Sequence, residues 1–179
     1  MPIQNPMNCV NPENRKRVLI ILLILIILIF SIFRFLDSPL RTEAAPSGIV
    51  SFELAGSAEK TNQILASWDT RADLFAAFGL GFDFLCMVVY ASTISLSCLM
   101  VSAKHTGRFS SLGTWLGWGA ILAAILDSIE NIALWNLLIG KTVPYLPQVA
   151  AWCASIKFTF ILLGILYGLA GWLMPKKRA

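Results

Sequence analysis

The feature that most constrains this chain is a set of long apolar stretches separated by short polar breaks. The first, at residues 18–36, is almost entirely Ile, Leu and Phe, and three more follow at 73–101, 112–139 and 147–173. A helix of about 20 apolar residues crosses the roughly 30 Å hydrocarbon core of a bilayer. Hydrophobic residues make up 57% of the chain and charged residues only 13%, against about 25% charged residues in a soluble domain. The sequence therefore predicts an all-α protein, a bundle of four transmembrane helices.

The first apolar stretch has two interpretations. Arg15, Lys16 and Arg17 precede it, and a basic flank before an apolar run is also typical of a secretory signal peptide. Residues 42–44 (Thr-Glu-Ala) then provide a candidate cleavage site. Because the apolar run is longer than that of an ordinary signal peptide, the favoured interpretation is an uncleaved anchor helix. This stretch has almost no small or polar residues, so we expect it to face lipid.

Residues 37–72 form the largest polar segment, and we expect it to contain one helix. Two prolines, Pro39 and Pro46, and Gly48 mark a loop, and residues 49–54 are predicted to form a short extended piece. Ser57 is a predicted cap for a helix that ends near Trp68, in which apolar side chains recur at helical spacing. This helix either binds a partner or lies at the membrane interface with Trp68 in the aromatic belt. The interfacial position is favoured.

Basic residues at the ends of the apolar stretches indicate the orientation in the membrane. They cluster at residues 15–17, 104–108 and 176–178. Loops rich in Lys and Arg stay in the cytoplasm. Both termini and the loop between the second and third helices should therefore be cytoplasmic, and residues 37–72 should lie outside the plasma membrane.

These boundaries divide the chain into five parts. They are a flexible cytoplasmic tail (1–17), a transmembrane anchor helix (18–36), an extracytoplasmic segment with an interfacial helix (37–72), a three-helix transmembrane core (73–174) and a basic cytoplasmic tail (175–179). The expected partner is the lipid bilayer. Nucleic acid is not expected as a partner, because the basic residues flank apolar stretches and form no separate patch.

The cysteines and the single histidine indicate no metal site and no cofactor. Cys86, Cys98 and Cys153 lie inside apolar stretches, and no Cys-x-x-Cys pair occurs. These three are typical of small buried hydrophobic residues, and Cys9 precedes the first stretch, so we expect no disulfide. His105 lies in a short basic turn, without a metal-ligand partner at suitable spacing.

Four ionisable residues lie well inside the predicted transmembrane helices: Asp83, Asp127, Glu130 and Lys157. Such side chains are costly in lipid and by default face the interior of a bundle. Counted from the outer ends of their helices, Asp83, Glu130 and Lys157 are each roughly 15 Å deep, at about 1.5 Å per residue. Asp127 lies one turn further toward the cytoplasm. We therefore expect three helices to bring charge to a similar depth near the membrane midplane.

Small residues share helix faces with these ionisable residues. In the third stretch a stripe of glycines and alanines leads to Asp127 and Asn131, and in the fourth Lys157 shares a stripe with Gly164. Small residues allow helices to approach closely. We expect the last three helices to pack around a polar centre, where Asn131 and Tyr90 can hydrogen-bond a carboxylate. The same faces are candidate contacts for a homo-oligomer or a membrane partner.

The candidate ligand- or ion-binding residues are those that face this polar centre: Asp83, Tyr90, Asp127, Glu130, Asn131 and Lys157. We predict that Lys157 neutralises either Asp83 or Glu130, and the other acids need a proton, a hydrogen bond or a bound cation. Three roles stay open: a lock that fixes helix rotation, a site for a ligand, proton or cation, and a catalytic pair. The sequence contains no evident nucleophile–base pair or metal-ligand set, so no catalytic residue is assigned.

Several short stretches resemble a group of bacterial four-span integral membrane proteins of unknown activity. The most specific is an Asp-x-x-Glu-Asn element in the third stretch, formed by Asp127, Glu130 and Asn131. The others are residues 52–56 (Phe-Glu-Leu-Ala-Gly), residues 64–68 (Ile-Leu-Ala-Ser-Trp), Asp83 with Tyr90, and residues 154–158 around Lys157. The resemblance covers residues 50–173 and implies a shared four-helix fold and polar core, without implying an activity.

The favoured function is that of a non-enzymatic integral membrane protein whose polar centre holds the bundle together and binds a small cationic or lipid-like ligand. The alternative is an intramembrane enzyme acting on a lipid-like substrate, or a proton-coupled carrier. A ligand among the acids favours binding, a wide cavity open to the bilayer favours lipid chemistry, and a dry, fully paired cluster favours the lock.

Overall fold

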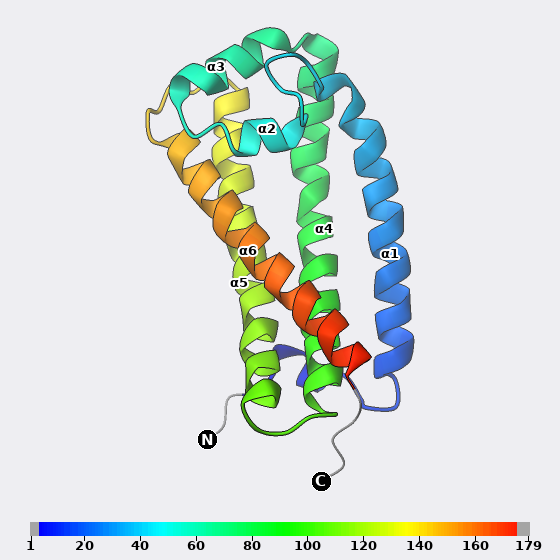
Figure 1. Cartoon of the computed structure of the whole chain (residues 1–179). Helices are drawn as coiled ribbons and strands as arrows, with labels where there is room; N and C mark the ends of the chain where they lie inside the picture. The colour runs from blue at the N-terminus through cyan, green and yellow to red at the C-terminus, as the bar shows by residue number, and fades with distance from the viewer. Residues whose placement is uncertain (1–3, 175–179) are drawn as a thin grey trace. The chain divides into compact units, whose positions relative to one another are not determined.

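The computed structural model describes residues 4–174 and is helical, with no β-strand in that range (Figure 1). The first long helix is α1 (Arg15–Leu36). In sequence it is preceded by a short 3₁₀ helix, η1 (Pro6–Cys9), and followed by another, η2 (Ser38–Leu40). Two short α-helices follow, α2 (Ile49–Glu53) and α3 (Ala58–Ser67). Three long helices complete the described chain: α4 (Thr70–Ser102), α5 (Gly107–Leu138) and α6 (Leu146–Leu173). The predicted basic tail at 175–179 lies outside the described residues.

Four helices, α1, α4, α5 and α6, are long and apolar enough to cross a membrane. Their bounds agree with the four predicted stretches to within about one and a half helical turns. The all-α fold with four potential spans is therefore confirmed. The longest, α4, has 33 residues, or about 50 Å at about 1.5 Å per residue, so it is longer than a bilayer core of roughly 30 Å.

The helices divide into two compact units, and each long helix contributes a segment to both. Unit 1 consists of Met1–Ile26, Val88–Ile125 and Lys157–Ala179. Unit 2 consists of Ile27–Met87 and Leu126–Ile156. Unit 1 therefore contains η1, and unit 2 contains α2 and α3 together with the segments of the long helices nearest to them in sequence.

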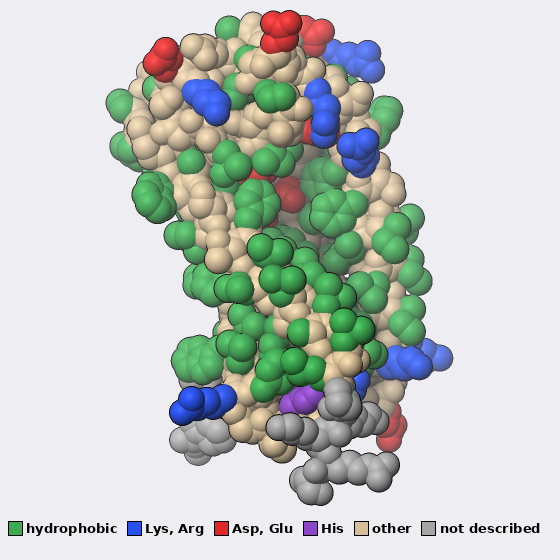
Figure 2. Space-filling view, in the orientation of Figure 1, with side chains coloured by type: hydrophobic (Ala, Val, Ile, Leu, Met, Phe, Trp, Pro, Cys, Tyr) green, Lys and Arg blue, Asp and Glu red, His purple; other side chains and the backbone are tan. Residues whose placement is uncertain are grey.

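Unit 2 has a hydrophobic core beneath its two short helices. α2 and α3 lie across the ends of α4, α5 and α6 (Figure 1), and Phe52, Ile64 and Leu134 are among the buried side chains of this core. Ser57 caps α3 as predicted, because its hydroxyl accepts a hydrogen bond from the backbone N–H of Lys60 at 3.2 Å. Charged side chains gather over α2 and α3 in Figure 2, above hydrophobic side chains on the long helices. The two short helices thus form a polar-topped cap on unit 2.

The prediction of an extended piece at residues 49–54 is wrong, because this segment begins α2. Gly48 precedes the helix at a φ of 59°, and a Cβ there would collide with the Asp37 carboxylate. That carboxylate accepts a hydrogen bond from the backbone N–H of Ile49 at 2.9 Å. The start of the helix therefore depends on a side chain twelve residues earlier. The local residue pattern gives no information about such a distant contact.

Trp68 also differs from its prediction, since it is buried in the cap and not placed at an exposed interface. Its ring packs against Phe52 with 5.2 Å between centroids, and its indole N–H donates to the Leu40 carbonyl at 2.9 Å. Inside unit 2 the apolar surface of the indole is packed against another ring, and its N–H donor has a hydrogen-bond acceptor. The helix that ends here is accordingly packed onto protein through Ile64 and Trp68.

In unit 1 the N-terminal segment packs onto the helices, whereas the sequence predicted a flexible tail. The Asn5 side chain is buried, and its amide donates to the Ser95 carbonyl at 3.4 Å. The Trp118 indole donates to the Gln4 carbonyl at 2.8 Å. Met7 adds an apolar contact to the core of this unit. Residues 4–9 are thus an integral part of unit 1, while their cytoplasmic location stays a prediction.

Glycines of α6 lie against α4 in unit 1, which confirms the predicted small-residue contact. A Cβ added at Gly164 would collide with Ile94, and one at Gly168 would lie 2.8 Å from the Ser97 hydroxyl. One turn further, Gly171 faces Val101 in the same way. The absence of side chains at these positions lets two helices approach closely.

The helix α1 presents most of its apolar side chains to the outside, as predicted for a lipid-facing anchor. Ile27 and Phe35 are each 66% exposed, a fraction that would be costly for large apolar groups in water. Its contacts in unit 2 include Phe33, whose ring lies edge-on to Phe82 with 5.4 Å between centroids, and Phe35, whose ring is 5.7 Å from that of Phe75.

Candidate functional site

A side-chain hydrogen bond joins α4 to α5 inside unit 2. The Asn131 amide donates to the Asp83 carboxylate at 2.9 Å and to the Leu80 carbonyl at 3.3 Å. Leu80 and Asp83 are three residues apart on α4 and therefore share a face. Asn131 is only 2% exposed and Asp83 is half-buried. This side-chain contact between two helices fixes which face of α5 turns toward α4.

Two further carboxylates on α5 are buried close to Asn131 in sequence. Asp127 is 2% exposed and Glu130 is 0% exposed. Asp127 lies one turn before Asn131 on the same helix face, and Glu130 lies at the edge of that face. Between them the Ser128 hydroxyl contacts the Met87 sulfur at 3.0 Å. This turn of α5 therefore buries two carboxylates close together. Burying a carboxylate costs free energy unless it is paired or protonated.

The structure brings together part of the predicted set of binding residues. Asp83 and Asn131 are in contact, as expected for an amide that hydrogen-bonds a carboxylate. Tyr90 and Lys157 are buried as predicted, but both belong to unit 1. Within that unit the Lys157 ammonium lies 5.0 Å from the centre of the Phe158 ring. The pairing of Lys157 with an acid of unit 2 stays a prediction.

Reasoning from the sequence missed one buried carboxylate, that of Glu53. This residue ends α2 and is buried, although it belongs to a segment that was expected to be polar and solvated. The available signal was its position between Phe52 and Leu54, since an acid inside an apolar run is seldom fully hydrated. Figure 2 shows acidic side chains at the back of a hollow directly beneath α2.

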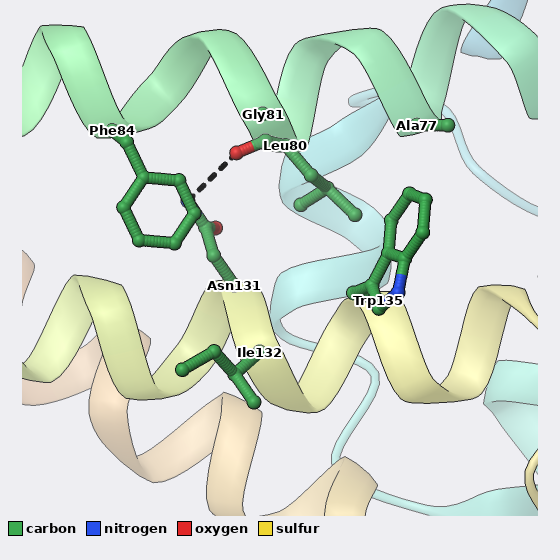
Figure 3. A pocket seen from close by; sticks show the side chains of 7 residues that line it. All are labelled: Ala77, Leu80, Gly81, Phe84, Asn131, Ile132 and Trp135. Carbon is green, nitrogen blue, oxygen red and sulfur yellow. Dashed lines mark hydrogen bonds between the residues drawn. The ribbon is translucent and has the colours of Figure 1, made fainter.

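A pocket of about 260 Å³ lies between α4 and α5 within unit 2. Its lining consists of Ala77, Leu80, Gly81 and Phe84 from α4 and Asn131, Ile132 and Trp135 from α5. In Figure 3 the Trp135 indole and the Phe84 ring project into the space between the two helices. The Asn131 carbonyl oxygen is buried and has no hydrogen-bond partner among residues 4–174. The pocket is therefore apolar, and one of its lining residues, Asn131, has an unsatisfied acceptor that is buried.

Metal ligands are not gathered anywhere in the part of the chain that the structure describes. Within residues 4–174, no group of three His, Cys, Asp or Glu side chains is placed to hold a metal ion. Cys9 is the exposed cysteine, and Cys86, Cys98 and Cys153 are buried. The chemistry that the described site supports is hydrogen bonding and charge pairing.

No known protein family, curated protein or solved structure matches this chain. The resemblance to bacterial four-span proteins therefore stays a prediction. The fold defines the class only broadly, as an all-helical protein with four helices able to cross a membrane. Its function has to be argued from its own residues.

Proposed function

We propose that this chain is a non-enzymatic integral protein of the plasma membrane, in which polar side chains of unit 2 lock the helices and bind a small cationic or lipid-like ligand. The observation that carries the proposal is the hydrogen bond from Asn131 to Asp83, made on the helix that also buries Asp127 and Glu130. In lipid, polar side chains find their partners mainly on neighbouring helices or on a ligand. A carboxylate held in this way is a natural contact for a donor group or a cation.

The membrane location is supported by the four long apolar helices and by the exposed apolar surface of α1. The orientation rests on basic residues, which favour the cytoplasmic side. Arg15–Arg17 at the start of α1 and Lys104 and Arg108 between α4 and α5 assign these ends to the cytoplasm. The cap formed by α2 and α3 is then extracytoplasmic, and both termini are cytoplasmic.

Lys157 is the base that the proposal assigns to the buried acids. It is 4% exposed, and it is the one Lys or Arg side chain buried within residues 4–174. A buried ammonium is strongly unfavourable without a carboxylate partner. If Lys157 neutralises Asp83 or Glu130, the remaining acids are the ones available to a ligand.

The test is a set of double variants measured by unfolding in a detergent titration. Lys157→Met leaves one buried acid without its counter-charge, so the free energy of unfolding should fall by about 3–5 kcal/mol, the loss seen for buried pairs in soluble proteins. Adding Asp83→Asn or Glu130→Gln should recover part of that loss for the true partner only. Lys60→Met, at an exposed position on α3, is the matched control and should change stability by less than about 0.5 kcal/mol.

The result that overturns the lock is a harmless Lys157→Met combined with no coupling in either double variant. In that case the lysine side chain reaches toward the interface and is not paired with these acids. Coupling to Asp83 alone would assign Glu130 to ligand binding, and coupling to Glu130 alone would assign Asp83.

A further inference from the structure

The pocket between α4 and α5 combines an apolar lining with an unsatisfied hydrogen-bond acceptor. The Asn131 amide uses its N–H groups for Asp83 and Leu80, which leaves its carbonyl oxygen without a partner among the described residues. An unpaired buried acceptor is costly, and most buried polar groups in proteins are satisfied. A donor supplied by a ligand would remove that cost.

The pocket opens at the outer surface of unit 2. Three of its lining side chains, Phe84, Ile132 and Trp135, are exposed large hydrophobic groups. In the proposed membrane setting this surface faces lipid, so a ligand enters sideways from the bilayer. The Asn131 oxygen has almost no accessible surface, so a ligand reaches it only when a lining side chain moves. Phe84 is exposed and is the lining side chain that can turn aside for this.

We propose that this pocket binds a small, neutral, ring-sized apolar molecule that carries one hydroxyl group. The hydroxyl donates its hydrogen to the Asn131 carbonyl oxygen, and the apolar ring packs between Phe84 and Trp135. A volume of about 260 Å³ is at the lower end for small-molecule pockets and is too small for a whole phospholipid. A cation is disfavoured, because no carboxylate lines the pocket.

This inference rests on the proposed membrane location and names the ligand class that the polar centre receives. It differs from the proposed lock in the residues that it needs. The lock is tested through Lys157 and the acids, whereas the pocket is tested through Trp135 and the empty space beside Gly81. A Cβ at Gly81 would have no described atom within 4 Å.

The experiment uses the full chain reconstituted in lipid nanodiscs with 4-bromophenol as the probe. Bromine in contact with an indole quenches its fluorescence, so binding should appear as a saturable loss of emission. That loss should be absent from Trp135→Phe, which removes the reporter and keeps an aromatic wall. The matched probe 4-bromoanisole has a methoxy group in place of the hydroxyl donor. Its affinity should be about tenfold lower, the effect of one lost hydrogen bond to a buried group.

Two glycine variants separate the pocket from general partition into the bilayer. Gly81→Leu adds a side chain to open space in the pocket and should abolish the saturable quenching. Gly79→Leu is the matched control, because a Cβ there also meets open space on the same helix and Gly79 does not line the pocket. It should leave the affinity for 4-bromophenol unchanged.

Quenching that is linear in probe concentration and equal in all variants overturns the proposal, since it reports partition alone. Equal affinity for the two probes overturns the role of the hydroxyl. A saturable site in a protein whose Lys157 variants show no coupling overturns the lock and leaves the pocket standing. Normal Lys157 coupling with no saturable site overturns the pocket and leaves the lock.

Discussion

Glycines inside the long helices have opposite surroundings in the two units of this protein. In unit 1, a Cβ at Gly113, Gly164 or Gly171 would collide with a side chain of the neighbouring helix. In unit 2, a Cβ at Gly79 or Gly81 would meet no described atom within 4 Å. The same residue type therefore marks close helix packing in one unit and unfilled space in the other.

The two units also differ in the side-chain hydrogen bonds that they contain. In unit 1 they include several bonds from hydroxyls to the backbone, such as the 2.6 Å bond from Ser95 to the Gly117 carbonyl. In unit 2 the bond from Asn131 to Asp83 involves a carboxylate and lies next to a pocket. Unit 1 therefore contains the close helix contacts, and unit 2 contains the candidate site.

The largest effect that this comparison predicts comes from leucine at a glycine of unit 1. Gly164→Leu should overpack the contact with Ile94 and lower the free energy of unfolding by about 1–3 kcal/mol. Gly79→Leu makes the same substitution in unit 2, where the space is open, and should lower it by much less. Both are measured by thermal unfolding in the same detergent. Equal losses would remove the distinction between the units.

The two indole hydrogen bonds are expected to differ, with an effect of at most the same size for one and a smaller effect for the other. Trp68→Phe keeps the ring contact with Phe52 but leaves the buried Leu40 carbonyl without its donor, which should cost about 1–3 kcal/mol at most. Trp118→Phe removes the bond to Gln4, which water can replace because that site is exposed, and should cost less than about 0.5 kcal/mol. Chemical denaturation of the two variants would compare them. A larger loss for Trp118→Phe would contradict the assignment of Trp68 to a buried core.

The sequence predicts those parts of the fold that depend on local features. Four long apolar stretches determine the four long helices, and Ser57 caps α3 through the backbone N–H of Lys60. The path of residues 37–72 depends on contacts between distant residues and was not predictable in this way. Asp37 starts α2 through Ile49, and Leu40 accepts the Trp68 donor, so tertiary contacts determine both.

The candidate site was predictable to a similar degree. Ionisable residues at matching depth identify Asp83 and Glu130, and helical spacing adds Asn131 as a hydrogen-bond donor. The pocket was not predictable, since it exists because two helices leave space where Gly81 has no side chain. Its volume depends on the separation of the helices, which residue spacing does not reveal.

The central claim is that the chain crosses the membrane with the cap of unit 2 outside the cell, and cysteine labelling tests it most directly. A background with Cys9→Ser removes the exposed thiol and keeps the three buried ones. Single cysteines are then placed at the exposed positions Glu59 on α3 and Thr106 between α4 and α5. With a membrane-impermeant thiol reagent on intact cells, Glu59→Cys should be labelled and Thr106→Cys should react only after lysis. Labelling of Thr106→Cys but not Glu59→Cys in intact cells would contradict the account.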